Sequence, residues 1–240
     1  MKEKISVLMP TSPIASHPST AIIAETISSV RKHLPNAPIF IMADGVRKEQ
    51  AAYTDRYVEY LHKMVGHAML NMNNIKLIPF MEFTHQAWMT VRALEKVETP
   101  FVLFVEHDTP LMDRPIDWEM LKTSISSGHA NHIRLHYDEE IHLEHEYLLR
   151  GKLTGHLLKT VQYSQRPHLA DTLWYRELLA ANFNENSRTF IEDKVYGVVS
   201  EAPWEKYRLA IYDPNGNGKE MKRSRDLNGR AADPKYSMVF

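Results

Sequence analysis

Short apolar runs alternate with amphipathic stretches along the first half of the chain. Four of these runs are rich in aliphatic and aromatic residues, which is typical of strands buried on both faces of a parallel sheet. Between them, apolar residues recur at the spacing of helices that pack on a sheet. The alternation predicts a parallel α/β layer with right-handed crossovers. The expected order is strand 4–10, helix 17–34, strand 37–45, helix 47–68, strand 75–80, helix 85–97 and strand 101–105.

The second half of the chain has a less regular pattern. Residues 138–168 fit a hairpin or a helix equally well. No internal repeat or low-complexity linker divides the sequence, so we expect a single domain over residues 1–240 with two unequal halves. The expected elements are helix 117–128, strand 129–137, helices 171–183 and 189–201, and a strand that runs into a turn within 207–218.

Composition and charge exclude some classes of protein. Hydrophobic residues make up 43% of the chain and charged residues 25%, as in ordinary globular proteins. The absence of cysteine excludes disulfides, thiolate metal sites and a cysteine nucleophile. Neither a signal peptide nor a membrane span is indicated, and we expect a cytoplasmic protein. With a net charge of −1, any contact with nucleic acid requires a local basic patch.

The fourth strand runs directly into Glu106-His107-Asp108. Side chains two residues apart in an extended chain point to the same side, so Glu106 and Asp108 can face one ion. In open α/β sheets the carboxyl ends of the strands border the ligand crevice. Carboxylate oxygens are the ligands that Mg²⁺ and Mn²⁺ prefer. The motif therefore predicts a divalent-metal site, and the alternative is a surface turn with two solvated acids.

Four segments in this order resemble the GT-A glycosyltransferases of the family-2 type. The segments are "MPTSP" (9–13), "MADG" (42–45), "FVEHDTPL" (104–111) and "IEDKVYG" (191–197). The resemblance implies an α/β, Rossmann-like, mainly parallel central sheet flanked by helices, with an irregular mixed second half. It also implies a hexosyltransferase that uses Mn²⁺ or Mg²⁺ and a nucleotide-sugar donor, with a UDP-sugar as the first choice. Residues 1–112 would bind the donor, and residues 113–240 would bind the acceptor and supply the catalytic groups.

The resemblance assigns donor-side roles to residues at the strand ends. Pro10 and Thr11 would flank the nucleotide, and Asp44 would bind its base or ribose, although Asp-Gly is also a common turn pair. Glu106-His107-Asp108 stands where the family has Asp-X-Asp. Because glutamate replaces the first aspartate, we expect Asp108 to bind the metal directly. Glu106 would then serve the ribose or bind the ion through water.

The catalytic role falls on Glu192-Asp193. The pair resembles the Glu-Asp pair of the family, whose aspartate is the general base, so Asp193 is the first choice and Glu192 the second. The structural alternative is that both acids merely stabilise a helix N-terminus. The resemblance implies inversion at the anomeric carbon, and retention stays open.

Two further segments carry polar groups that suit a ligand. Near the C-terminus, Arg223 and Arg225 could pair with phosphates, and Asp226 could supply the third metal ligand, for which the family commonly uses histidine. A solvated basic tail is the alternative there. In segment 163–177, Gln165 and His168 lie near two aromatic residues and suit a sugar or a base, although such aromatics are often core.

Two rival functions keep the same fold. A nucleotidyltransferase usually has a glycine-rich, basic loop after the first strand, whereas residues 10–20 contain no glycine, lysine or arginine. A non-catalytic nucleotide-binding module would explain glutamate at position 106. The acceptor also stays open, with a glycan, a protein or a hydroxymethylated DNA base as candidates. The sequence determines neither the sugar nor the oligomeric state.

Overall fold

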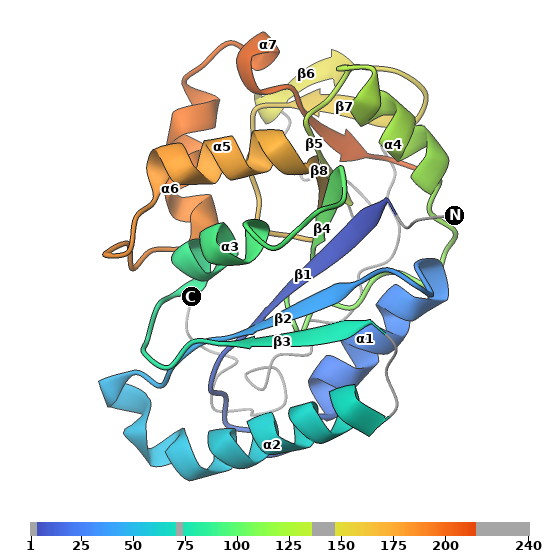
Figure 1. Ribbon diagram of the computed structural model, residues 1–240. Helices are drawn as coiled ribbons and strands as arrows, with labels where there is room; N and C mark the ends of the chain where they lie inside the picture. The colour runs from blue at the N-terminus through green and yellow to red at the C-terminus, as the bar shows by residue number, and fades with distance from the viewer. Residues whose placement is uncertain (1–3, 71–73, 136–146, 215–240) are drawn as a thin grey trace.

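The computed structural model describes residues 4–70, 74–135 and 147–214 (Figure 1). Its centre is a nine-stranded sheet with the order β3-β2-β1-β4-β8-β5-β9-β7-β6. The first four strands pair in parallel, as the sequence predicts, because each is joined to the next by a helical crossover. These strands are β1 (Ile5–Thr11), β2 (Ile39–Ala43), β3 (Ile75–Pro79) and β4 (Phe101–Phe104).

The second half of the chain extends the same sheet with mixed pairing. Strand β8 runs antiparallel to β4 and β5, β9 is parallel to β5, and β7 is antiparallel to β9 and β6. The sheet is therefore mixed, and the expectation of a mainly parallel sheet is wrong. Short connections such as the one between β6 and β7 permit only antiparallel pairing. The strands are β5 (His132–Leu135), β6 (Leu149–Lys152), β7 (Leu157–Thr160), β8 (His168–Asp171) and β9 (Leu209–Tyr212).

Helices cover both faces of the sheet (Figure 1). One apolar core lies between the sheet and α1, α2 and α4, and a second lies between the sheet and α3, α5 and α6. Within the described residues, no helix is long and apolar enough to cross a lipid bilayer. The helices are α1 (Ala21–His33), η1 (Lys48–Tyr53, a 3₁₀ helix), α2 (Thr54–Leu70), α3 (Gln86–Leu94), α4 (Trp118–Ser126), α5 (Thr172–Asn182), α6 (Ile191–Ser200) and α7 (Trp204–Tyr207).

Helix boundaries follow local chemistry. Asp117 and Asp171 cap α4 and α5, since each carboxylate accepts a hydrogen bond from a backbone amide of the first turn. Helix α1 begins at Ala21, so the predicted start at residue 17 is wrong. The reason is His17, whose buried ring stacks on Tyr60 with centroids 4.0 Å apart and holds the preceding turn against α2.

Candidate functional site

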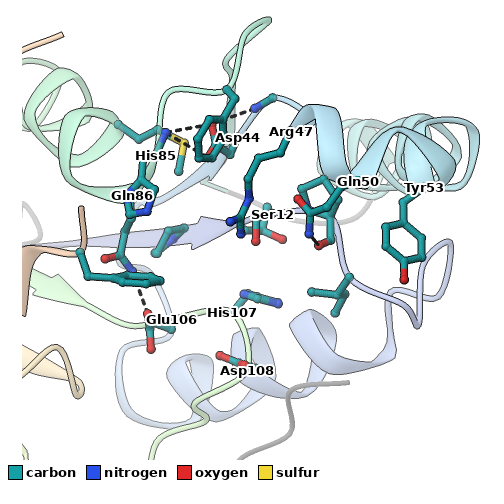
Figure 2. Close-up of a pocket in the computed structure, with 18 of the residues that line it drawn as sticks. Ser12, Asp44, Arg47, Gln50, Tyr53, His85, Gln86, Glu106, His107 and Asp108 are labelled. Carbon is teal, nitrogen blue, oxygen red and sulfur yellow. Dashed lines mark hydrogen bonds between the residues drawn. The ribbon is translucent and has the colours of Figure 1, made fainter. Parts of the chain in front are cut away.

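A cavity of about 490 Å³ opens at the carboxyl ends of β1, β2 and β4 (Figure 2). This is the edge at which open α/β sheets bind ligands. Its wall is formed by residues that follow these strands, by the start of α3 and by Phe190 just before α6. Five of the residues selected from the sequence line it together, namely Pro10, Thr11, Asp44, Glu106 and Asp108.

The other selected residues have different positions. Glu192 and Asp193 belong to the first turn of α6, directly after Phe190, and do not line the cavity wall. Arg223, Arg225 and Asp226 lie outside the described residues. Of the polar residues in segment 163–177, His168 is fully buried in the core. Gln165 reaches Glu106 at the cavity wall and forms a hydrogen bond with it.

Asp44 holds the loop that precedes α3. Its Oδ1 accepts the backbone amides of Gly45 at 2.9 Å and Thr84 at 2.7 Å, and its Oδ2 accepts that of His85 at 3.1 Å. Only 4% of the residue is exposed. The carboxylate thus joins the end of β2 to the start of α3, a structural task that the Asp-Gly pair in the sequence does not reveal.

Gly45 is required by the close approach of this loop. A Cβ atom at this position would lie 2.2 Å from the carbonyl carbon of Glu82 and 2.5 Å from the backbone nitrogen of Phe83. Backbone atoms cannot yield as a flexible side chain can, so any larger residue displaces the loop. The glycine therefore allows the loop to pass close enough for its amides to reach Asp44.

Two glutamines bind the carboxylate of Glu106. Its Oε1 accepts hydrogen bonds from Nε2 of Gln86 at 2.7 Å and from Nε2 of Gln165 at 2.9 Å. Gln165 is held in turn by Glu192, because its backbone amide donates to Oε2 of Glu192 at 3.0 Å. The backbone amide of Glu192 donates back to Oε1 of Gln165 at 3.2 Å. A continuous chain of hydrogen bonds therefore connects the end of β4 to the first turn of α6.

Comparison with known proteins gives a match in structure alone. No protein-family model matches the sequence, and no curated protein matches it. TarS 1–349 from S. aureus aligns with a TM-score of 0.55 at 15% identity, over 92% of this chain and 60% of that one. GalNAc-T7 with UDP, GalNAc and Mn²⁺ aligns with a TM-score of 0.62 at 12% identity, over 94% and 44% of the two chains. The chain has the GT-A fold.

A third GT-A neighbour is the mannosyltransferase PcManGT from Pyrobaculum calidifontis in complex with GDP-Man and Mn²⁺. It aligns with a TM-score of 0.53 at 13% identity, over 89% of this chain and 55% of that one. The chain therefore spans 44% to 60% of the length of these three neighbours. The structural alignments establish the GT-A fold. Because the sequence identities are this low, the activity must be argued from the site.

The acidic end of β4 carries the oxygen ligands that divalent cations prefer. Both Glu106 and Asp108 line the cavity, and the hydrogen bonds to Glu106 occupy Oε1 and leave Oε2. Within the described residues, no group of three or more histidine, aspartate or glutamate side chains is placed to hold a metal. An ion here would thus take two carboxylates and complete its shell with water and ligand oxygens, as Mg²⁺ usually does.

Electrostatics at Glu106 suit a cationic partner. Burial, followed by the nearby charge of Asp108, raises the pKa of Glu106 to about 7, while the two glutamine amides oppose this shift. Near neutral pH the carboxylate is therefore only partly ionised. A positive charge in the cavity would favour its ionised form.

Proposed function

We propose that this chain is a glycosyltransferase that moves a hexose from a nucleotide-diphosphate sugar to an acceptor hydroxyl, with the help of Mn²⁺ or Mg²⁺. A UDP-sugar is the first choice of donor. The observation that supports this most is the cavity at the ends of β1, β2 and β4, with two carboxylates in its wall. Residues 1–112 bind the donor, and residues 113–240 bind the acceptor and supply the base.

The donor lies in the cavity with its nucleotide against Pro10, Thr11 and Asp44. Asp108 would bind the divalent ion directly, and Glu106 would offer its Oε2 to the ribose or, through water, to the ion. When bound, the ion neutralises negative charge on the departing diphosphate. Arg223 and Arg225 as phosphate partners and Asp226 as a third metal ligand stay predictions from the sequence, because these residues lie outside the described part of the chain.

Asp193 acts as the general base in this proposal. It takes the proton from the acceptor hydroxyl while that oxygen forms a bond to the anomeric carbon. The bond from that carbon to the phosphate oxygen breaks, and its electron pair leaves with the nucleoside diphosphate. One such in-line displacement inverts the configuration. Glu192 is less suitable, because its carboxylate already binds the amide of Gln165, whereas the side chain of Asp193 is exposed.

The direct test is the release of nucleoside diphosphate from a panel of UDP-sugars with Mn²⁺ and without acceptor. A general base contributes about 10²- to 10⁴-fold, so Asp193→Asn should lower transfer to an acceptor by at least about 100-fold, with UDP affinity unchanged. Glu192→Gln is the matched control and should lose much less. Equal transfer by wild type and Asp193→Asn would remove the proposed base.

The two rival functions give different results in the same assay. A nucleotidyltransferase would consume a nucleoside triphosphate and a sugar phosphate, with release of pyrophosphate. A binding module would bind UDP and Mn²⁺ but release nothing from any UDP-sugar, with or without candidate acceptors. Either result would replace the proposed reaction.

A further inference from the structure

Three loops bring arginine and aromatic side chains together at the mouth of the cavity. The Cζ atom of Arg47 lies 5.2 Å from the centroid of the Phe83 ring, and that of Arg188 lies 5.8 Å from it. The ring of His85 lies edge-on between two phenylalanines, 5.6 Å from Phe83 and 4.9 Å from Phe190. We call these five residues the arginine–aromatic rim. Figure 2 shows Arg47 and His85 on the same wall as Asp44.

Within the described part of the chain, the rim arginines have no acidic partner and some of the apolar side chains nearby are exposed. Neither Arg47 nor Arg188 has a carboxylate of a described residue within ion-pair distance. The guanidinium group of Arg188 donates to the backbone carbonyls of residues 185 and 187. Phe190 is 49% exposed, and Met81, in the same loop as Phe83, is 91% exposed. Two arginines beside the half-buried Phe83 ring, with the exposed Phe190 ring next to them, indicate a partner with negative charge and flat faces.

The backbone at His85 adds an independent indication. Its φ of 69° and ψ of 153° fall in a region that is populated almost solely by glycine. Such strain persists where the surrounding structure enforces it, and it clusters at ligand sites. Here the hydrogen bonds from the backbone amides of Thr84 and His85 to Asp44 hold the loop. The strained backbone directs the His85 ring to its place between Phe83 and Phe190.

The rim borders the proposed general base. Phe190 and Arg188 precede Asp193 by three and five residues on the same loop and helix start. The pKa of His85 is lowered by burial first and then by the charges of Arg47 and Arg188, while the charge of Asp193 opposes them. The three charged groups therefore act on one location. A molecule held by the rim therefore lies within the electrostatic reach of Asp193.

We propose that the arginine–aromatic rim binds the acceptor as a nucleic-acid single strand, with backbone phosphates on Arg47 and Arg188 and an unpaired base stacked on Phe190. This inference rests on the proposed function, because it names the acceptor of the same reaction, and it adds Arg47 of the donor half to the acceptor contacts made by residues 113–240. Guanidinium groups match phosphate oxygens, and exposed phenylalanine rings match base faces. A neutral glycan would leave both arginines unpaired, and a polyol phosphate would leave the rings exposed.

A single strand fits better than a duplex. The rim lies at the wall of the cavity of about 490 Å³ in which the donor is proposed to lie, and a base can stack on Phe190 beside the donor only when it has left the helical stack. The overall charge of −1 provides no general attraction to DNA, so the two rim arginines must supply the local positive charge. The substrate class is thus an unpaired nucleic-acid strand that carries an acceptor hydroxyl group.

The test is fluorescence anisotropy with a labelled twelve-nucleotide thymidine strand over a range of salt concentrations. Each phosphate contact adds about −0.7 to the slope of log affinity against log salt for single strands, so two arginines predict a slope of about −1.4. Arg188→Ala should move the slope to about −0.7. Phe190→Ala should keep the slope and weaken binding by about tenfold or more.

Arg150→Ala is the matched control. Like Arg188, Arg150 is exposed and donates to two backbone carbonyls of its own segment, but it lies on the edge strand β6, five strands from β4. It should leave both slope and affinity unchanged. Arg188→Lys, which keeps the charge, should restore most of the slope and excludes misfolding as the cause of the Arg188→Ala effect.

Three results would overturn the proposal. These are no binding of the strand by wild type, equal slopes for Arg188→Ala and Arg150→Ala, and displacement of the strand by a polyol phosphate at lower concentrations than by unlabelled strand. Titration of the wild type with UDP and Mn²⁺ in parallel separates the two claims. Strand binding without nucleotide binding would refute the proposed transferase and leave the rim as a nucleic-acid surface.

Discussion

Gln165→Glu tests the hydrogen-bond chain that joins the two halves of the site. The substitution keeps the shape of the side chain and replaces an amide donor by a carboxylate. In the native site Nε2 of Gln165 lies 2.9 Å from Oε1 of Glu106, so two carboxylate oxygens would face each other there. At high pH the variant therefore loses a hydrogen bond to a charged group and gains a repulsion.

The loss of stability caused by Gln165→Glu should be larger at high pH than at low pH. Burial and the charge of Asp108 already raise the pKa of Glu106 to about 7, and a second carboxyl raises both values further. Carboxyls whose folded-state pKa exceeds the unfolded value near 4.5 stabilise the protein at low pH, and this stability is lost as pH rises toward the folded pKa. Loss of a charged hydrogen bond costs about 1.5–3 kcal/mol. We expect the variant to lose about 3 kcal/mol at pH 8 and below about 1 kcal/mol at pH 5, where a shared proton restores the bond.

The assay is urea unfolding followed by circular dichroism at pH 5 and pH 8. Gln162→Glu is the control, because Oε1 of Gln162 accepts a hydrogen bond from Nη1 of Arg134 at 3.0 Å. The same change of residue in the same loop there places a carboxylate against a cation and should not destabilise the protein at pH 8. Equal losses for Gln165→Glu at both pH values, or an equal loss for Gln162→Glu, would refute the described contact with Glu106.

Three other predictions follow from the structure. Gly45→Ala places a Cβ atom 2.2 Å from the carbonyl carbon of Glu82, so we expect a loss of about 1–3 kcal/mol in urea unfolding; an unchanged midpoint would contradict this. Burial lowers the pKa of His168 to about 4, so the unfolded chain takes up a proton at higher pH than the folded chain does. The free energy of unfolding therefore falls by about 3 kcal/mol between pH 6.5 and pH 4. His168→Phe should flatten that part of the pH–stability curve, and an unaltered slope would argue against a neutral buried histidine. Asp108→Ala should abolish the stabilisation by UDP with Mn²⁺ while the melting temperature of the free protein barely moves; unfolding of the variant would make Asp108 structural.

The first half of the fold follows from the apolar pattern, and in the second half the pattern also identifies α4, β5, α5, α6 and β9 but not β6, β7 and β8. Strands β1 to β3 have five to seven residues, and β4, with four, belongs to a continuous apolar run, so the pattern identifies all four between regular helices. Strands β6, β7 and β8 also have four residues each, but they mix polar and apolar residues, so neither a continuous apolar run nor an alternation distinguishes a strand from a helix there. Their antiparallel pairing, which makes the sheet mixed, depends on contacts across the chain that no local pattern records.

The candidate site can likewise be predicted only in part from the sequence. Residues at or shortly after the carboxyl ends of parallel strands meet at one edge, so Thr11, Asp44 and Asp108 could be grouped from the sequence alone. The amides that surround Asp44, and the contact of Gln86 with Glu106, depend on how loops distant in sequence pack together. The strained backbone of His85 likewise has no signal in the sequence, because histidine has no preference for that conformation.

The measurement that tests the central claim most directly is a calorimetric and thermal-shift titration with UDP, GDP, CDP and dTDP, each with and without Mn²⁺. If the protein is a nucleotide-sugar transferase with its metal at Asp108, we expect one nucleotide, with UDP as the first choice, to bind only when Mn²⁺ is present. At a hundred times its Kd it should stabilise the protein by about 2.7 kcal/mol. If no nucleotide stabilises the protein, or if Mn²⁺ makes no difference to any of them, the proposed donor site is wrong.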